Sequence, residues 1–370
     1  MAALRLKIPT IAITGSAGKT TTKEMIASVL KTKWNVFKSY KNNNNPELHT
    51  KKHAKLIQPD HQAVVLEFGM SREGFGKKHC SYIEPNISII TSIGLAHIGS
   101  LGGKLEKIVE AKSAIFKYMK PTGTLLINKD DENSRLLQTD HFKGEIVTVG
   151  IKNKADYQAK NVKFVDNGMS FQVKLDKQLE TFVIPSFGSH NVINALFAIA
   201  VSHRLQFSPA EIRKGLANFE KPVRRLFVRQ LKEDSLLIDD SYSANPHAVK
   251  VAIDVMNEIG KSKKKVAILG SMLELGEHSQ RLHEDIGKYL AKNNINAVIT
   301  YGEHATFIAE GARSAGLPLS QLVSFNDREK LHAYLDQMDR ANTVFLVKGS
   351  NGMKMNQTVK HLVKIIGIKK

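Results

Sequence analysis

The chain has 370 residues, of which 42% are hydrophobic and 24% are charged, a balance typical of a globular protein with room for two domains. Its one cysteine, Cys80, excludes an intrachain disulfide and a cysteine-based zinc site, and favours a cytoplasmic location. The net charge of +19 favours anionic partners, but no basic stripe interleaved with aromatic residues predicts nucleic-acid binding. The N-terminus is too short and too charged for a signal peptide, and no apolar run approaches the ~18 residues of a membrane span.

Residues 11–23, I-A-I-T-G-S-A-G-K-T-T-T-K, have the layout of a phosphate-binding loop between a strand and a helix. Backbone N–H groups of the small residues can turn toward phosphate oxygens, Lys19 can reach the β- and γ-phosphates, and the Thr20 hydroxyl can hold Mg²⁺. The loop is short, because Ile13 stands where the common form has glycine. An ordinary strand–helix turn is the alternative, and the flanking elements favour nucleotide binding. The predicted loop contacts are Gly15, Ser16, Ala17, Gly18, Lys19, Thr20 and Thr21.

The first half of the chain alternates apolar strands with helical segments. The expected strands are 8–14, 64–68, 86–93 and 124–128, and the expected helices run from the loop to about 31 and over 105–120. This alternation predicts a mostly parallel sheet with helices on both faces and ligands at the carboxyl ends of the strands. Glu67, the His97 region and Asn128 follow strand ends, so we expect them beside the phosphate loop.

Residues 145–185 have short alternating runs and a turn signal at 166–168, which predict an antiparallel β insertion or edge. A helix is expected over 191–204, and a second α/β series begins near Pro222. The prediction is therefore an α/β protein with a phosphate-loop central domain, 1–221, and a C-terminal Rossmann-like domain, 222–370. In the second series the expected strands are 235–239, 266–270, 297–302 and 343–347, and the expected helices are 246–259, 280–292, 305–315 and 353–366.

Five candidate positions carry chemistry outside the loop, and each has a structural alternative. Glu67 could hold Mg²⁺ or be a strand-end acid facing solvent. His97 is an uncommon type of Mg²⁺ ligand, so chemistry alone favours a structural role, and Lys112 alone looks like a surface lysine. Asn191 and Asn194 could bond an adenine edge or cap their helix.

Two further candidates lie near the domain boundary. Arg225 could neutralise charge on a γ-phosphate, and Asp240, after Asp239, could accept a ribose hydroxyl. A boundary ion pair is the alternative for these residues.

Together these segments resemble the Mur ligase family, the ATP-dependent amide-bond ligases of bacterial cell-wall synthesis. The resemblance rests on the short loop T-G-S-A-G-K-T-T-T-K, E-F-G from Glu67, S-I-G-L-A-H from Ser92, A-K at Ala111-Lys112, H-N-V-I-N from His190, and the pair Arg225 and Asp240. The strings D-D-S-Y-S-A-N-P (239–246), L-G-S-M-L-E-L-G-E-H (269–278) and V-K-G-S (347–350) are similar to the branch that adds D-alanyl-D-alanine to a peptidoglycan precursor.

The resemblance implies a role for each candidate. Lys19 and the loop amides would hold ATP, and Thr20 with Glu67 would bind one Mg²⁺. His97 would bind a second Mg²⁺, and Lys112 would be carbamylated. Asn191, Asn194, Arg225 and Asp240 would contact the nucleotide. The implied reaction forms an acyl phosphate from an anionic carboxylate substrate and ATP, and an amino acid or dipeptide amine then displaces phosphate.

The chain departs from the family pattern at several positions. Leu48 and Thr50 replace a Gly and a Pro, Ala114 replaces a Glu, Ser271 replaces an acid, and Asn351 stands where Arg is frequent. The family's N-terminal substrate-binding domain is represented only by 1–8, so a partner protein is expected to supply it if that domain is required. The alternatives are a paralogue acting on another anionic acid, of the poly-γ-glutamate or small-polyacid type, a non-catalytic nucleotide-binding partner, and, on charge alone, a nucleic-acid-stimulated ATPase.

Overall fold

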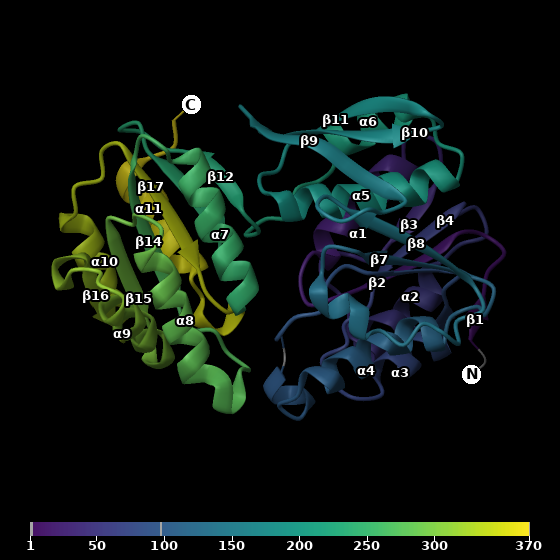
Figure 1. Ribbon diagram of the computed structural model, residues 1–370, viewed down its shortest axis with the longest axis horizontal. Coiled ribbons are helices and arrows are strands. Elements are labelled where there is room, and N and C mark those ends of the chain that lie inside the picture. Colours follow the sequence, from purple (N-terminus) through teal and green to yellow (C-terminus); the bar gives the residue numbers. More distant parts are fainter. Residues whose placement is uncertain (1–2, 97, 370) are drawn as a thin grey trace. The chain divides into compact units, whose positions relative to one another are not determined.

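The computed structural model describes residues 3–96 and 98–369. Their contacts divide the chain into two compact units, Met1–Pro222 and Val223–Lys370, which we call unit 1 and unit 2 (Figure 1). The boundary expected from the sequence lies one residue earlier. Each unit has its own apolar core, so each is described by itself.

Unit 1 is built on a large sheet whose central strands are parallel. Its strands are β2 (Thr10–Thr14), β3 (Val36–Lys38), β4 (Ala63–Glu67), β6 (Ile87–Ile90), β7 (Thr124–Asn128), β8 (Glu145–Gly150), β9 (Tyr157–Val165), β10 (Gly168–Leu175) and β11 (Gln178–Ile184). Among the described residues their order is β11-β10-β9-β8-β7-β6-β2-β4-β3. The short strands β1 (Leu4–Arg5) and β5 (Ile83–Glu84) pair separately. Strand β2 therefore lies between β4 and β6, which sets the phosphate loop beside the ends of both.

The antiparallel region predicted over 145–185 is smaller in the structure. Strand β8 is parallel to β7 and β9 is parallel to β8, so only the pairs β9–β10 and β10–β11 are antiparallel. The reason is that Val147 and Val149 of β8 are buried and extend the core of the parallel sheet. In the β10–β11 turn, Asp176 and Lys177 have left-handed backbones with φ of 44° and 72°. The turn has no glycine at these positions, so it could not be predicted from the sequence.

Helices cover both faces of the sheet in unit 1 (Figure 1). They are α1 (Lys19–Leu30), α2 (Lys51–Leu56), α3 (Phe75–Tyr82), α4 (Leu105–Lys117), α5 (Ser189–Arg204) and α6 (Pro209–Ala217). Helices α1, α5 and α6 pack together over one face, and α4 covers β2 and β6 on the other. A Cβ on Gly215 would lie 2.3 Å from the Cα of Val29, so this glycine lets α6 approach the backbone of α1.

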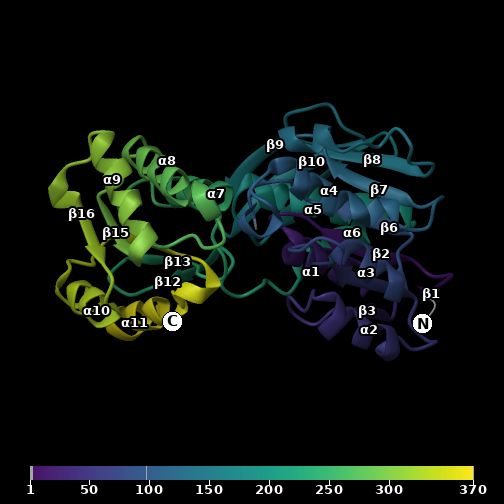
Figure 2. The same cartoon turned by 90° about the horizontal axis from the view of Figure 1, so that it is seen from below.

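Unit 2 is a smaller sheet between two layers of helices (Figure 2). Its strands are β12 (Phe227–Gln230), β13 (Leu236–Asp240), β14 (Lys264–Gly270), β15 (Ala297–Tyr301), β16 (Leu322–Phe325) and β17 (Thr343–Lys348). Their order is β12-β13-β17-β14-β15-β16, with only β12 antiparallel among the strands described. Helices α7 (Pro246–Ile259), α8 (Ser279–Ala291) and α9 (Thr306–Ser314) cover one face, and α10 (Arg328–Gln337) and α11 (Asn356–Ile366) cover the other.

The predicted fold class, an α/β protein with two mostly parallel sheets, is confirmed. Helix α7 and strand β7 have the predicted bounds, because Asn245 caps α7 just before Pro246 and 121–123 break the chain before β7. In residues 3–96 and 98–369, no helix combines the length and hydropathy needed to cross a bilayer.

Candidate active site

The phosphate loop has the backbone that its glycines permit. Gly15 has φ 146° and Gly18 has φ 85°, both of which disfavour other residues. A Cβ on Gly15 would lie 2.0 Å from Thr91 Oγ1, and one on Gly18 would lie 2.5 Å from Asn194 Oδ1. Thr91 and Asn194 therefore pack closely against the two glycines of the loop. Helix α1 begins at Lys19, where the first N–H groups of a helix favour an anion.

The segment after β6 holds the loop in place. Ser92 accepts hydrogen bonds from the backbone N–H groups of Ser16 (2.9 Å to O) and Ala17 (3.1 Å to Oγ). The amide of Gly94 donates to Ser16 Oγ at 2.8 Å, and the amide of Ile93 donates to Asp131 Oδ2 at 2.7 Å. The N–H groups of Ser16 and Ala17 therefore bond to Ser92, and their role in holding phosphate stays a prediction.

Lys19 and Thr20 lie at the first turn of α1, next to the end of β4. The Lys19 ammonium donates to the carbonyl of Gly15 at 2.6 Å, so it lies over the loop. The Thr20 hydroxyl donates to Glu67 Oε2 at 2.8 Å, and both side chains are buried. Glu67 is therefore not the solvent-facing acid that was its structural alternative.

Asn44 is a member of this site whose role the sequence did not reveal. Its Nδ2 donates to Glu67 Oε1 at 2.7 Å, so the two carboxylate oxygens have separate partners. The run Asn42–Asn45 was visible in the sequence, but only the fold brings it to β4. Asparagine and glutamate are 23 residues apart along the chain.

The oxygen donors of Thr20 and Glu67 fit Mg²⁺. Within the described ranges no group of three or more His, Cys, Asp or Glu side chains could hold a metal ion. A pair of one hydroxyl and one carboxylate suits Mg²⁺, which keeps several waters and takes its other ligands from substrate phosphates. Thr20 and Glu67 are therefore the residues that would hold such an ion, with Asn44 bonded to the other carboxylate oxygen.

Lys112 is not the surface lysine that its sequence context alone suggests. It lies on α4 with 2% of its surface exposed, and burial, followed by repulsion from Lys19, lowers its pKa to about 7. A substantial fraction of Lys112 is therefore an uncharged amine near neutral pH. His97, the other predicted ligand of a second metal, lies outside the described residues.

The candidate adenine contacts are buried between α1 and α5. Thr22 Oγ1 donates to Asn194 Oδ1 at 3.1 Å, and Asn194 Nδ2 donates to Asn191 Oδ1 at 3.0 Å. Asn191 Nδ2 donates to the carbonyl of Phe187 at 2.8 Å. These bonds join the start of α5 to the first turns of α1, and the adenine role stays a prediction.

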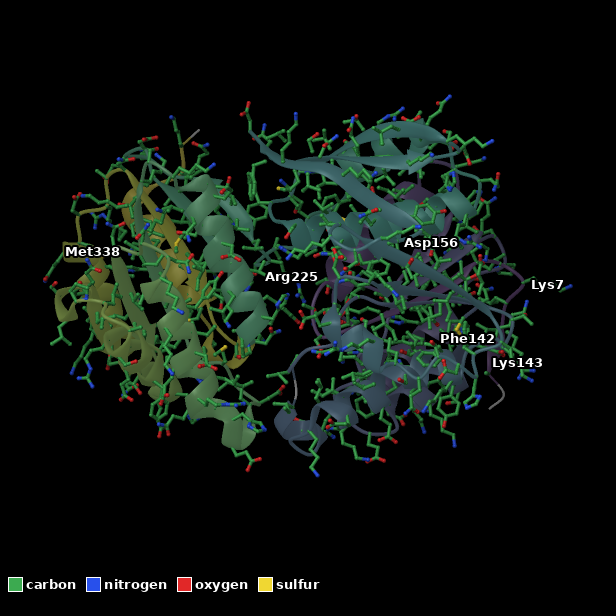
Figure 3. All side chains as sticks on the ribbon, viewed as in Figure 1. Lys7, Phe142, Lys143, Asp156, Arg225 and Met338 are labelled. Carbon is green, nitrogen blue, oxygen red and sulfur yellow. The ribbon has the colours of Figure 1, made fainter. Side chains whose placement is uncertain are left out.

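In unit 2 the predicted residue Asp240 lies at the carboxyl end of β13, beside Lys348 at the carboxyl end of β17. Lys348 Nζ lies 2.5 Å from Asp240 Oδ2, and the amide of Leu226 donates to Asp240 Oδ1 at 3.0 Å. Burial raises the pKa of Asp240, and Lys348 opposes that rise. Arg225 lies on the segment before β12 (Figure 3). Its guanidinium is 4.2 Å from the ring centroid of Tyr242. The sequence analysis assigned no role to Lys348, although V-K-G-S marked its segment.

Three residues that depart from the family pattern, Ala114, Ser271 and Asn351, make specific contacts in the fold. A Cβ on Gly76 of α3 would lie 2.4 Å from the Cβ of Ala114 on α4, so a larger residue at 114 would separate the helices. Ser271 Oγ accepts the amide of Ala305 at 3.1 Å, and Asn351 Oδ1 accepts from Arg224 at 3.1 Å.

Thr50 and Leu48 lie in η1 (Pro46–Thr50), one turn of π-helix. Thr50 is buried and bonded to His79, whereas the side chain of Leu48 is exposed.

Comparison with known families identifies the class. The Mur ligase middle domain matches residues 13–202, and the Mur ligase glutamate ligase domain matches residues 224–351. The chain therefore belongs to the Mur ligase family, as its motifs predicted, and is an ATP-dependent peptide ligase.

Individual relatives within the family are similar to almost the whole chain. The UDP-N-acetylmuramoyl-tripeptide–D-alanyl-D-alanine ligase of Bacillus subtilis is 33% identical over 96% of this chain and 76% of the relative. The enzyme of that name from Escherichia coli is 29% identical over 97% of this chain and 78% of the relative.

Two solved structures have the same architecture. MurF from Acinetobacter baumannii superposes with a TM-score of 0.87 at 28% identity, covering 96% of this chain and 77% of that one. MurF from Thermotoga maritima in complex with ADP superposes with a TM-score of 0.84 at 25% identity, covering 97% and 80%.

Proposed function

We propose that this ligase joins D-alanyl-D-alanine, or a similar amine, to the carboxylate of an anionic peptidoglycan precursor in the cytoplasm, where ATP is available. The chemistry rests on one observation, the buried Thr20–Glu67 pair at the first turn of α1 beside Lys19. The choice of substrates rests on the similarity to D-alanyl-D-alanine ligases over almost the whole chain.

Thr20 and Glu67 would hold Mg²⁺, and Lys19 would leave the Gly15 carbonyl to contact the β- and γ-phosphates of ATP. Mg²⁺, when bound, neutralises phosphate charge and orients the γ-phosphoryl group. The N-terminus of α1 adds its first N–H groups and its positive dipole end. Arg225 and Asp240 would contact the nucleotide, and Asn191 and Asn194 would make its adenine contacts.

The reaction would proceed in two steps. An oxygen of the substrate carboxylate attacks the γ-phosphorus, the bond to the β-phosphate oxygen breaks, and ADP leaves an acyl phosphate behind. The uncharged amine then attacks the acyl carbon, loses its proton, and the tetrahedral intermediate expels inorganic phosphate. Lys19 would stabilise negative charge on the transferring phosphoryl oxygens in the first step.

Lys112 would act as a carbamate. Its lowered pKa supplies the uncharged amine that attacks carbon dioxide, and the product loses a proton to become an anion. This reaction replaces the buried amine by an anion that can accept hydrogen bonds or bind a second Mg²⁺. His97 would share that second ion.

The test is a phosphate-release assay on the full chain with UDP-N-acetylmuramoyl-tripeptide and D-alanyl-D-alanine. We expect release that requires ATP, Mg²⁺, the acid and the amine together, and that Lys19→Ala abolishes. Release unaffected by Lys19→Ala would contradict the proposed site.

A second candidate function is the same chemistry on a different anionic acid. It is favoured by the exposed Leu48 and the buried Thr50, where the family pattern has Gly and Pro. Turnover with a poly-γ-glutamate or small-polyacid acceptor, and none with the muramoyl tripeptide, would support it. ATP binding without turnover across all acid–amine pairs would instead leave a nucleotide-binding role.

A further inference from the structure

A buried histidine on α3 is connected by hydrogen bonds to Glu67, the proposed metal ligand. His79 is 0% exposed and its ring stacks on Phe68, with centroids 4.2 Å apart and planes 13° apart. Its Nδ1 lies 2.7 Å from Thr50 Oγ1, and its Nε2 lies 3.0 Å from the carbonyl oxygen of Gly69. Both ring nitrogens are therefore committed to specific partners.

The partners define the tautomer. A carbonyl oxygen only accepts, so Nε2 carries the proton and donates it to Gly69, while Nδ1 accepts the hydroxyl proton of Thr50. Burial lowers the pKa of His79 to about 4, so the ring is neutral at physiological pH. A neutral ring of one tautomer can support Thr50 and Gly69 at the same time.

Gly69 connects His79 to Asn44. The amide of Gly69 donates to the carbonyl of Asn44 at 2.8 Å, and Asn44 Nδ2 donates to Glu67 Oε1 at 2.7 Å. A Cβ on Gly69 would lie 2.7 Å from both oxygens of Asn44, so the two segments touch. A continuous chain of bonds thus runs from His79 to the carboxylate of Glu67.

We propose that His79 is a positioning residue for the magnesium carboxylate. Through Gly69 it fixes the backbone of Asn44, so that Asn44 occupies Glu67 Oε1 and leaves Oε2 to face Thr20 and the metal. Through Thr50 it anchors the far end of η1, at a position where the chain has exchanged the family's proline for a hydroxyl. This inference rests on the proposed function of Thr20 and Glu67 as magnesium ligands.

Two substitutions of His79 distinguish the role of Nε2 from that of Nδ1. The amide nitrogen of His79→Gln can take the place of Nε2 and donate to Gly69, whereas the side chain of His79→Asn reaches only the place of Nδ1. We expect His79→Asn to weaken the magnesium-dependent part of ADP binding by about 10-fold or more, as loss of a group that orients a metal ligand does. His79→Gln should stay within about 3-fold of the wild type, because it keeps the bond to Gly69.

The chain offers a matched control between the same two elements. Tyr82 of α3 donates to Glu47 of η1 at 2.7 Å on the exposed side, so Tyr82→Phe removes an η1–α3 bond that does not lead to Glu67. It should leave magnesium dependence unchanged. The readout is ADP affinity by titration calorimetry, with Mg²⁺ and with EDTA, together with urea unfolding without ligand.

The outcomes are distinct. Equal loss of ADP affinity with Mg²⁺ and with EDTA in His79→Asn, or no loss at all, would overturn the positioning role. If His79→Asn does not fold, His79→Phe decides: it keeps a ring to stack on Phe68, has no nitrogen to donate to Gly69, and should weaken only the magnesium-dependent binding. Unchanged binding in that variant would overturn the proposal. Absence of any magnesium effect in the wild type would instead overturn the metal site itself.

Discussion

Lys112 illustrates how burial changes the chemistry of a side chain. A lysine amine has a usual pKa of about 10.4, and in this protein burial and Lys19 bring it to about 7. Since the folded-state pKa lies below the unfolded one, the unfolded chain binds more protons between these values. Stability therefore rises with pH across that window.

The lowered pKa of Lys112 leads to a measurable pH dependence of the free energy of unfolding. In carbon-dioxide-free buffer, the wild type should gain about 2 kcal/mol in free energy of unfolding between pH 7 and 9 relative to Lys112→Met, which has no ammonium to titrate. Urea unfolding of both proteins at the two pH values tests this. Parallel changes in the two proteins would show that Lys112 titrates normally in the fold.

The same amine should make the ligase sensitive to carbon dioxide. Wild-type activity should fall in degassed, carbon-dioxide-free buffer and return when bicarbonate is added. Lys112→Arg keeps a cation but cannot form a carbamate under these conditions, so its residual rate should not respond to bicarbonate. A wild-type rate independent of bicarbonate would contradict carbamylation of Lys112.

At the scale of elements, α3 and α4 are matched by two small residues. Gly76→Ala places a Cβ 2.4 Å from that of Ala114, which overpacks the contact and should cost about 1–3 kcal/mol. In the double variant Gly76→Ala/Ala114→Gly the collision is removed, so the two effects should not add. Urea unfolding of the four proteins in this cycle measures the coupling, and strictly additive losses would show that the helices do not touch there.

Helices and strands were predictable from the sequence where a local motif, such as a helix cap or a glycine-rich loop, marked them. Helix α7, with its Asn245 cap and Pro246, and the phosphate loop with its strand and helix were predictable in this way. Helix α3 was not, because it has only eight residues and begins after Gly74, which has φ 77° and no side chain to cap a helix. Strand β8 was misjudged because its pairing depends on a neighbour rather than on its own alternation.

The site was predictable to the same extent. Lys19 and Thr20 could be proposed from the loop motif and Glu67 from its position at a strand end, and the structure brings Thr20 and Glu67 into contact. The support from Asn44 and the burial of Lys112 could not be predicted, since both depend on contacts between segments distant along the chain.

At the scale of the whole molecule, the two cores are separate. Phe197 is buried in the core of unit 1, and Phe345 is buried in the core of unit 2. Replacing either phenylalanine by alanine should cost about 3–5 kcal/mol in its own unit. In calorimetry we expect two transitions, with Phe197→Ala lowering one and Phe345→Ala lowering the other. A single transition lowered equally by both would show that the units unfold together.

Cys80 has a practical consequence for work on this ligase. It is buried on α3, where burial raises its pKa to about 12, so its thiol is shielded from alkylating reagents. A cysteine introduced at the exposed turn between β10 and β11, as in Lys177→Cys, would then be the preferred target of a maleimide dye. A single dye can then be attached at that turn without first removing the native thiol.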